Sequence, residues 1–575
     1  MNLLILDMET HYDQDYSLAK MPTMQYVRDA RFECLGCAFG TADGDYYAPM
    51  WAGEDFPDST VGRLNRIDWP NTIAVAHNAQ FDGAVLHHHF GHAPAFWLDT
   101  LDWTRYAISQ GALPPDASTS LRAWGERLGL AKGDTAEAVA AGGDALGDYA
   151  VRDIEITRAA LDWLREHCPW PEAEWRTSDL HVKMATQPRL ALDKPLLERL
   201  AADTLDPDMA KAVRSRETFA KALRAIGIEP GTKTSPANGK QTYAFAKTDC
   251  FMRELGNHPD PRARTLAELK AQGGSTIVAA RAQRFLDVGD PLPVPLRYYG
   301  AHTGRASGLD KLNLQNLPRG RFRDVLRAPE GYALVAADYS QIEARVVAWG
   351  AGDGAALAPF TSGKDPYKVV ACDLYGTDYD AVTDEQRRRA KAAVLALGFG
   401  QGVNGFVTYC EMFGIEIDPR EAAGIVETWR RTRPRMVAWW SELFDTVLHD
   451  GELVLPSGRK LTYPGIEQRG REVTYRRQTA FSKRRDGDVV NLWHGLVAEN
   501  WTQAVARDII YHAALDMPWP VVMQIHDELI MLVPTAEVDT AVDQIETTML
   551  QLPAWAAGLP VACEVAVGQT YGESK

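Results

Sequence analysis

Two groups of acidic residues in this sequence have types and spacings suited to holding divalent cations. Asp7 and Glu9 leave an apolar run as D-x-E, and residues i and i+2 of a strand point to the same face. Asp82 lies in HNAQFD, and Tyr149 precedes Asp153 by one helical turn. Four carboxylates that meet at one point repel one another unless cations lie between them. The pattern therefore predicts a site for Mg²⁺, and two such ions about 3.5–4 Å apart can drive phosphodiester hydrolysis.

The second group consists of aspartates far apart in the sequence. Asp338 ends the apolar run YALVAAD, and Asp527 lies in QIHDELIML, which has the composition of one buried strand. In such a strand His526 and Glu528 would face one side and Asp527 the other. Carboxylates are rarely buried without a partner, because removing their charge from water is costly. A second two-metal site, with one ion on a 3′ hydroxyl and the other on a triphosphate, would support nucleotidyl transfer.

A predicted helix supplies cations for a triphosphate. In DEQRRRAKAAVLALGFGQG, 384–402, one stripe recurs every four residues through Arg387, Lys391, Leu395 and Phe399. The stripe begins basic and becomes apolar, which suits the phosphates and then the sugar and base of one nucleotide. An amphipathic helix with a solvated basic start would show the same pattern, so the segment alone leaves both interpretations open.

Elements from several domains must bring these residues together. Strand patterns cover 2–6, 332–338 and 521–533, strand, turn and helix follow one another in 72–90, and helical spacing covers 146–167. Breaks at CPWP, 168–171, and GDPLPVP, 289–295, mark domain boundaries. Because 575 residues are too many for one hydrophobic core, we expect an α/β multidomain protein.

Composition and net charge limit the kinds of partner and metal site that we expect. A net charge of −16 argues against a general nucleic-acid coat protein, although a basic channel can lie on an acidic body. The stretch 469–485 is basic, and Arg476 and Arg477 are candidates for phosphate contacts; a solvated loop is the alternative. The histidines of HHHFGH, 87–92, could bind zinc or simply end a helix. Seven scattered cysteines fit a reducing, cytoplasmic setting, and no apolar run reaches the length of a membrane span.

The first acidic group, in its order and context, resembles the proofreading 3′–5′ exonucleases of the DEDD class, in the version with tyrosine in the third motif. The match covers roughly residues 1–165. It implies an RNase H-like exonuclease domain over 1–170. By motif position, the metal ligands would be Asp7, Glu9, Asp82 and Asp153, and Tyr149 would orient the attacking water.

The remainder resembles family A DNA polymerases, the bacterial DNA polymerase I type. DYSQIEARVVAW, RRRAKAAVLALGFG and QIHDELIML are similar to motifs A, B and C of that family. AHTGRASGLDKLNLQNLPRG, 301–320, is similar to its T-G-R…N-L-Q-N-x-P stretch, and ENWTQAVARDII, 499–510, to its glutamine helix. The resemblance implies a right-hand polymerase over 171–575. Its subdomains would be a thumb over about 172–295, a palm over about 296–350 and 496–575, and fingers over about 351–495.

The resemblance also assigns roles by motif position. The metal ligands would be Asp338 and Asp527, with Glu528 auxiliary. The nucleotide would contact Arg387, Lys391, Leu395, Phe399, Tyr367, Tyr339, Gln341 and Glu343. Within that set, Lys391 would protonate the departing pyrophosphate, and Tyr339 with Glu343 would reject a ribose 2′-hydroxyl. DNA would contact Arg305, Asn316, Arg345, Gln503 and His526, together with Arg476 and Arg477.

Three residues depart from the family pattern. Leu395 stands where many relatives have Phe or Tyr, Phe399 replaces a Tyr, and Tyr367 stands where the bacterial enzymes have a His. These departures leave open how selective for nucleotides and how fast the protein is. They do not change the reaction that the resemblance implies.

The family implies cofactors and partners as well. We expect two Mg²⁺ ions per active site, with Mn²⁺ as a substitute, and a monomer that binds primer-template DNA and dNTPs. A helicase, primase or single-strand-binding protein would be its replication partners. The first exonuclease motif begins at residue 7 and the opening resembles phage-encoded members, so we expect a phage replicative enzyme without a 5′-nuclease domain.

Three alternatives remain. A single-subunit RNA polymerase-like enzyme would share the palm acids, but Glu343 behind Tyr339 and the attached exonuclease motifs argue against it. A repair polymerase would carry the same motifs. A non-catalytic DNA-binding factor would not need both intact sets of acids.

Overall fold

The computed structural model describes residues 1–50, 58–202, 212–213, 215–234, 241–246, 249–271, 276–318, 320–478 and 488–575. Residues 479–485 of the predicted basic stretch lie outside the described residues. Among the described helices, none combines the length and the apolar character that crossing a membrane requires.

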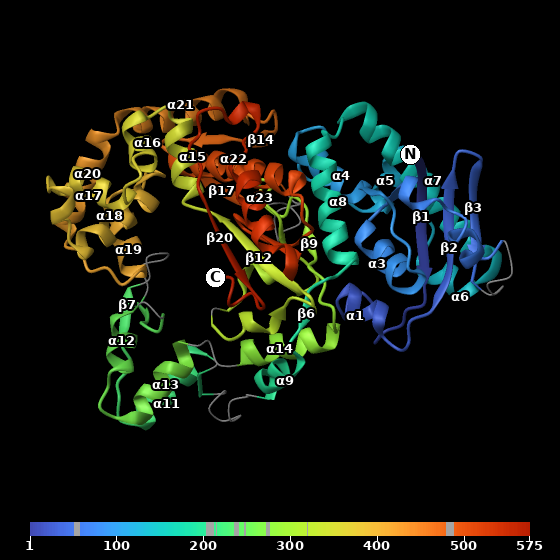
Figure 1. Ribbon diagram of the computed structural model, residues 1–575, viewed down its shortest axis with the longest axis horizontal. Coiled ribbons are helices and arrows are strands. Elements are labelled where there is room, and N and C mark those ends of the chain that lie inside the picture. The colour runs from blue at the N-terminus through green and yellow to red at the C-terminus, as the bar shows by residue number, and fades with distance from the viewer. Residues whose placement is uncertain are drawn as a thin grey trace.

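A five-stranded sheet covered by helices forms the N-terminal part, drawn blue to teal in Figure 1. The strand order is β3-β2-β1-β4-β5, and the central β1 is antiparallel to β2 and parallel to β4. The strands are β1 (Asn2–Thr10), β2 (Cys34–Thr41), β3 (Gly44–Pro49), β4 (Thr72–Ala76) and β5 (Phe96–Asp99). The helices are α1 (Thr23–Arg28), α2 (Thr60–Leu64), α3 (Ala79–Phe90), α4 (Thr100–Ser109), α5 (Leu121–Leu128), α6 (Thr135–Ala141) and α7 (Gly143–His167). Because β1 continues to Thr10, Asp7 and Glu9 both lie in the strand, as their spacing predicts.

A helical segment follows, drawn in green in Figure 1. Its helices are α8 (Glu172–Thr186), α9 (Lys194–Ala202), α11 (Arg216–Ala225), α12 (Cys250–Gly256), α13 (Pro261–Ala271) and α14 (Thr276–Val288). β7 (Thr232–Thr234) lies in the polar interruption predicted at 230–240 and pairs antiparallel with β8 (Gln241–Tyr243). α9 pairs with α14, and the outer helices have a separate small core around Phe219 and Leu223. α8 instead packs on α3 and β5, so it is joined to the first sheet rather than to the outer helices.

A second sheet carries the other acidic group. Its order is β18-β19-β12-β20, all antiparallel neighbours. The strands are β12 (Tyr332–Tyr339), β18 (Val521–Ile525), β19 (Glu528–Pro534) and β20 (Cys563–Gly568), and the helices are α15 (Ile342–Gly350), α22 (His494–Asp516) and α23 (Val538–Leu550). Short pairs join β6 (Ala191–Leu192) to β11 (Leu326–Arg327) and β9 (Leu296–Arg297) to β10 (Ser307–Gly308). β12 lies at the centre with its middle residues buried on both faces.

The helices predicted as fingers form a separate group at the left of Figure 1. They are α16 (Gly354–Thr361), α17 (Pro366–Tyr375), α18 (Asp384–Leu397), α19 (Val403–Met412), α20 (Pro419–Thr432) and α21 (Pro434–Asp450). A hairpin of β13 (Glu452–Val454) and β14 (Lys460–Thr462) follows, and then a three-stranded sheet of β15 (Glu467–Arg469), β16 (Glu472–Arg476) and β17 (Val489–Leu492). No pattern in the sequence predicts this last sheet, because its strands are only three to five residues long.

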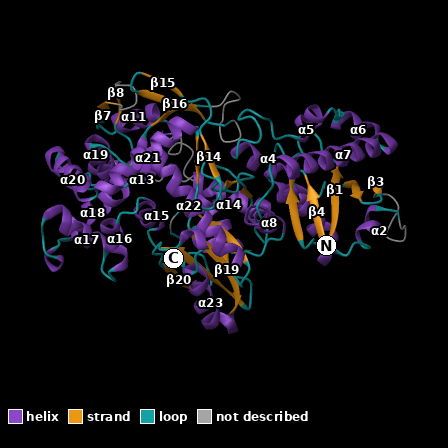
Figure 2. Cartoon of the chain, turned by 90° about the horizontal axis from the view of Figure 1, so that it is seen from above, coloured by secondary structure: helices purple, strands orange, loops and turns teal. Residues whose placement is uncertain are grey.

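A buried network of charges joins the two halves of the chain. Arg507 on α22 donates to both carboxylate oxygens of Glu174 on α8, and Arg459 donates to Asp508 over 2.8 Å. All four side chains are at most 6% exposed. Tyr298 donates a further hydrogen bond of 2.5 Å to Glu174. Two guanidinium groups and two carboxylates thus balance in charge where α8 lies between the first sheet and α22 (Figure 2).

We predict that Glu174→Ala lowers the free energy of unfolding by about 3–5 kcal/mol, because two buried guanidinium groups are then left with only one carboxylate, Asp508. Urea denaturation followed by circular dichroism measures this change. The matched control is Glu172→Ala on the same helix. Glu172 is 74% exposed, and its carboxylate lies 3.7 Å from the guanidinium of Arg176, which is a long, exposed ion pair. The control should change stability by less than about 1 kcal/mol. Equal effects of the two substitutions would contradict the importance of the network.

Candidate functional site

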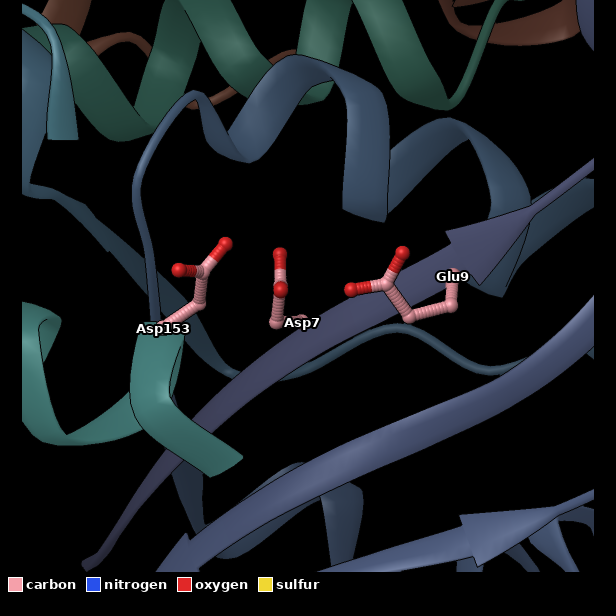
Figure 3. Close-up of side chains that lie close together, drawn as sticks. All are labelled: Asp7, Glu9 and Asp153. Atoms are coloured by element: carbon pink, nitrogen blue, oxygen red, sulfur yellow. The ribbon is translucent and has the colours of Figure 1, made fainter. Parts of the chain in front are cut away.

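Three carboxylates of the first acidic group converge above the N-terminal sheet. β1 contributes Asp7 and Glu9, and α7 contributes Asp153 where it crosses the sheet. One ligand oxygen from each of the three lies within 4.8 Å of the other two. Figure 3 shows all three side chains pointing into the same space. Carboxylate oxygens at this separation are the ligands that a hard divalent cation takes.

The fourth predicted acid, Asp82, lies beside this group but is held differently. It occupies the first turn of α3, is 2% exposed, and accepts a hydrogen bond of 2.9 Å from the main-chain N–H of Met8. Burial and the nearby Asp7 raise the pKa of Asp82 well above its usual value. The structure therefore brings all four predicted acids together, with three converging directly and Asp82 behind them.

The carboxyl groups of Asp7 and Glu9 both have raised pKa values, so full ionisation of this acidic group is unfavourable. Burial, followed by repulsion from Asp153, raises the pKa of Asp7 to about 7. Burial, followed by repulsion from Asp7 and Asp153, raises the pKa of Glu9 to about 9. A bound divalent cation would offset both causes, so this donor set fits Mg²⁺.

Lys132, which no sequence pattern predicted, lies against the same acidic group. The ammonium of Lys132 donates to Asp153 and lies 5.0 Å from the ring centre of Tyr149. The Tyr149 hydroxyl is 2.6 Å from Oγ1 of Thr135, so the predicted water-orienting group is held by α6. Lys132 lies in a loop between helices, and no periodic spacing in the sequence marks it.

The neighbouring histidines belong to no metal-ligand group among the described residues. Nε2 of His89 lies 2.9 Å from the carbonyl oxygen of Val27, and Nε2 of His92 lies 3.1 Å from Oδ1 of Asn65. These contacts support the helix-end alternative rather than zinc.

The segment QIHDELIML is a hairpin, so its prediction as one strand is wrong. β18 ends at Ile525, β19 begins at Glu528, and these two residues pair across a two-residue turn. His526 has a φ of 52°, which such tight turns require at their centre. The main-chain N–H of Tyr339 donates to the carbonyl oxygen of Asp527 over 3.2 Å. The turn, and not alternation along a strand, therefore brings Asp527 to the end of β12.

The second acidic group lines a cleft of about 510 Å³ at this end of the sheet. Asp338 on β12 is paired in register with Glu528 on β19. Glu528 is 2% exposed and accepts a hydrogen bond of 3.0 Å from the Tyr571 hydroxyl. Burial is the main cause that raises the pKa of Asp527 to about 6. Asp338 and Asp527 thus offer carboxylates from adjacent elements, a donor set that fits Mg²⁺.

Arg305 connects this group to the predicted sugar-selecting residue. Its guanidinium lies 2.8 Å from Glu343 and 3.4 Å from Asp527. Both carboxylates are partly exposed, so solvent reaches both contacts. Arg305 thereby fixes Glu343, at the start of α15, beside the metal-ligand candidate Asp527.

The helical spacing predicted for the nucleotide stripe holds from Arg387 to Leu395, while its contact with a nucleotide stays a prediction. Arg387 donates to Asp365 over 2.6 Å, and the cationic groups of Arg387 and Lys391 both lie 5.5 Å from the ring centre of Tyr367. Leu395 is half-buried on the same side of α18. α18 ends at Leu397, however, so the helical spacing does not continue to Phe399, which lies in the following turn.

Two predicted contact residues point elsewhere. Tyr339 follows Asp338 in the strand and faces the opposite side, where its hydroxyl donates to the carbonyl oxygen of Met549 over 2.6 Å. Arg345 is 6% exposed and donates to the carbonyl oxygens of Ser340, Phe360 and Pro560. These contacts join both residues to elements around the sheet, and the nucleotide contact of Tyr339 and the DNA contact of Arg345 stay predictions.

The other predicted contact residues stay accessible. Asn316 and His526 line the cleft, and Gln503 is half-buried on α22 with its amide 3.1 Å from Glu499. Gln341 is half-buried at the start of α15, Arg476 is exposed on β16, and Arg477 is half-buried after it. Their roles stay predictions.

The raised pKa values of Asp7 and Glu9 predict how stability depends on pH without divalent cations. A carboxyl with a raised pKa binds its proton more tightly in the folded state, so stability falls as pH rises from about 4 through 7. In EDTA, Asp7→Asn should flatten this fall and give a higher melting temperature at pH 8. Mg²⁺ should stabilise the unsubstituted protein more than Asp7→Asn. Calorimetry from pH 5 to 8 measures both effects, and parallel profiles for the two proteins would contradict the charge repulsion.

Comparisons with known proteins agree with the geometry of the second site. Residues 295–573 match the family described as DNA polymerase family A. The DNA polymerase of Bacillus phage SP02 is 24% identical, over 99% of this chain and all of the phage protein. DNA polymerase I of Pseudomonas aeruginosa is 30% identical over 48% of this chain and 29% of its own length. The thermostable DNA polymerase I of Thermus filiformis is 28% identical over 67% of this chain and 46% of its own length. The chain thus spans less than half the length of these two bacterial relatives.

A solved structure shares the fold. The POL domain of Pol1 from M. smegmatis, in complex with DNA primer-template and dNTP, superposes with a TM-score of 0.70 at 20% identity. The superposition covers 99% of this chain and 96% of the other. The match of residues 295–573 to DNA polymerase family A and this shared fold agree with the placement of Arg305 beside Asp527 in the cleft.

Proposed function

We propose that this protein is a replicative DNA polymerase that also removes nucleotides from the primer end by 3′–5′ exonucleolysis.

 The family match, and the pairing of Asp338 with Glu528 in the second sheet beside Asp527, support the synthetic activity. The convergence of Asp7, Glu9 and Asp153 within 4.8 Å is the observation that carries the exonuclease activity. The full-length similarity to a phage DNA polymerase supports a role in phage genome replication.

The polymerase residues have separate tasks in this proposal. When bound, Mg²⁺ would lower the pKa of the attacking oxygen and stabilise the departing one at each of the two sites. Asp338 and Asp527 would hold the cations against the primer 3′ hydroxyl, with Glu528 oriented by Tyr571. Arg387 and Lys391 would bind the triphosphate, and Lys391 would give a proton to the departing pyrophosphate.

The exonuclease residues would act on the same primer strand after it leaves the polymerase site. Asp7, Glu9 and Asp153, with Asp82 behind them, would hold the cations. The Tyr149 hydroxyl, placed by Thr135, would orient the attacking water. Because the two sites lie on different sheets, each can be inactivated without removing the residues of the other.

Primer-template DNA would lie across the cleft of the palm. Asn316, His526 and Gln503 would contact it near the reacting end, and Arg476 and Arg477 would contact its phosphates further away. Mn²⁺ would substitute for Mg²⁺, and a helicase, primase or single-strand-binding protein would work with the enzyme during replication.

We predict two separable activities. Asp338→Ala or Asp527→Ala should abolish primer extension and leave the degradation of single strands, because only the palm site loses a ligand. Asp7→Ala should do the reverse. Primer-extension and single-strand degradation assays with Mg²⁺ measure the two activities. Loss of both activities in one folded variant would contradict two independent sites.

We also predict that Glu343 excludes ribonucleotides. A 2′-hydroxyl placed against this carboxylate would clash or lose its hydrogen bonds, which costs about 1–3 kcal/mol. Glu343→Ala should therefore weaken discrimination against ribonucleotides by about five- to 150-fold. Single-nucleotide insertion kinetics with dNTPs and rNTPs measure this change.

Glu343→Gln is the matched control for this prediction, because it keeps the size of the side chain and removes its charge and its ion pair with Arg305. It should retain most of the discrimination. Unchanged discrimination in Glu343→Ala would show that another residue selects the sugar, and high ribonucleotide insertion by the unsubstituted protein would favour the RNA polymerase-like alternative.

A further inference from the structure

A folded turn after β20 carries a lysine into the polymerase cleft. Glu573 accepts hydrogen bonds from the main-chain N–H groups of Gln569 and Thr570, and Tyr571 donates its main-chain N–H to Leu326 over 2.9 Å. Tyr571 and Ser574 are at most 2% exposed. The turn is therefore fixed to the palm, and it determines where the following residue, Lys575, can place its side chain.

The ammonium of Lys575 lies between two carboxylates of the site. It is 3.2 Å from Oδ2 of Asp338 and 3.0 Å from Oε1 of Glu528. These two acids are directly paired across β12 and β19, so one cation can reach both. The Lys575 side chain is 28% exposed, which leaves it in the wall of the cleft rather than in bulk water.

Close packing also fixes the position of this turn against the palm. A Cβ atom built on Gly572 would lie 1.9 Å from Oδ1 of Asp324, so the turn approaches the palm too closely there for another residue type. The Tyr571 hydroxyl bonds the second oxygen of Glu528, and the Arg323 guanidinium lies 5.3 Å from the Tyr571 ring centre. Glu528 is therefore held from two sides by one turn.

We propose that Lys575 is a positioning residue of the polymerase site. Its ammonium holds the carboxylates of Asp338 and Glu528 together while no divalent cation is bound, and it competes with the cation for Asp338. When the cation binds Asp338, Lys575 keeps its contact with Glu528 alone. The inference rests on the proposed polymerase function of this site and adds to it a cation supplied by the chain itself.

The physical argument is a competition between charges. A positive group near 3 Å from a carboxylate lowers the attraction of that carboxylate for a second cation. Because Asp338 is 48% exposed, solvent screens the effect and limits it to the range of a surface ion pair. Arg305 stands in a similar relation to Asp527, so the chain itself offers a cation to each of the two aspartates.

The first test is the Mg²⁺ dependence of primer extension. Lys575→Ala should lower the Mg²⁺ concentration for half-maximal extension by about two- to fivefold, whereas Lys575→Arg should stay close to the unsubstituted protein. The Mg²⁺ dependence of single-strand degradation is the internal control, because that site has different ligands, and it should not change. An unchanged or raised Mg²⁺ requirement for extension would overturn the proposal.

The second test does not depend on activity. Mn²⁺ binding is followed by electron paramagnetic resonance in an Asp7→Ala background, with a dideoxy-terminated primer-template and the next dNTP. Lys575→Ala should bind Mn²⁺ more tightly than the background protein by a similar factor, with the melting temperature measured for both. Equal affinities would overturn the inference even if the polymerase activity is confirmed. Tighter binding without extension by the unsubstituted protein would instead refute the proposed function of the site.

Discussion

Repulsion between carboxylates is the constraint on which the rest of this structure depends. Burial raises the pKa of Asp7, Glu9 and Asp527 together, which shows that each site concentrates negative charge in surroundings that disfavour it. Such groups persist in a folded protein only where rigid elements hold them and cations can offset them. A strand pair or a strand with a crossing helix supplies that rigidity at both sites.

The chain partly offsets this repulsion with its own cations. Lys132 pairs with Asp153, Lys575 with Asp338 and Glu528, and Arg305 with Asp527. Each of these cations comes from a loop or turn outside the strands that carry the acids. A long, partly exposed side chain can change its rotamer while the backbone stays in place, so such a cation can move away while the carboxylates stay fixed.

Elements whose residues follow a clear strand or helix period are predictable from the sequence, whereas elements set by tertiary contacts are not. The strand of Asp7 and Glu9 and the helix of Asp153 were predictable, because the spacing of each pattern matches its element. The hairpin at His526 was not, because apolar residues continue through a two-residue turn and conceal it. The orientation of Tyr339 follows from strand alternation, because it comes directly after Asp338 in β12. Lys132 and Lys575 carry no periodic signal at all.

The two sites are also tied into one framework. Besides the network around Glu174, the hairpin of β13 and β14 is bonded to the end of α4: Gln110 accepts from the main-chain N–H of Lys460, and Thr462 donates to the carbonyl oxygen of Ser109. Gln478 donates to the neighbouring carbonyl of Ile108. Hydrogen bonds between side chains of one half and main-chain groups of the other therefore join the two halves, in addition to the buried charges. Because these contacts involve main-chain groups at the ends of helices and strands, they fix the spacing between the two groups of acids.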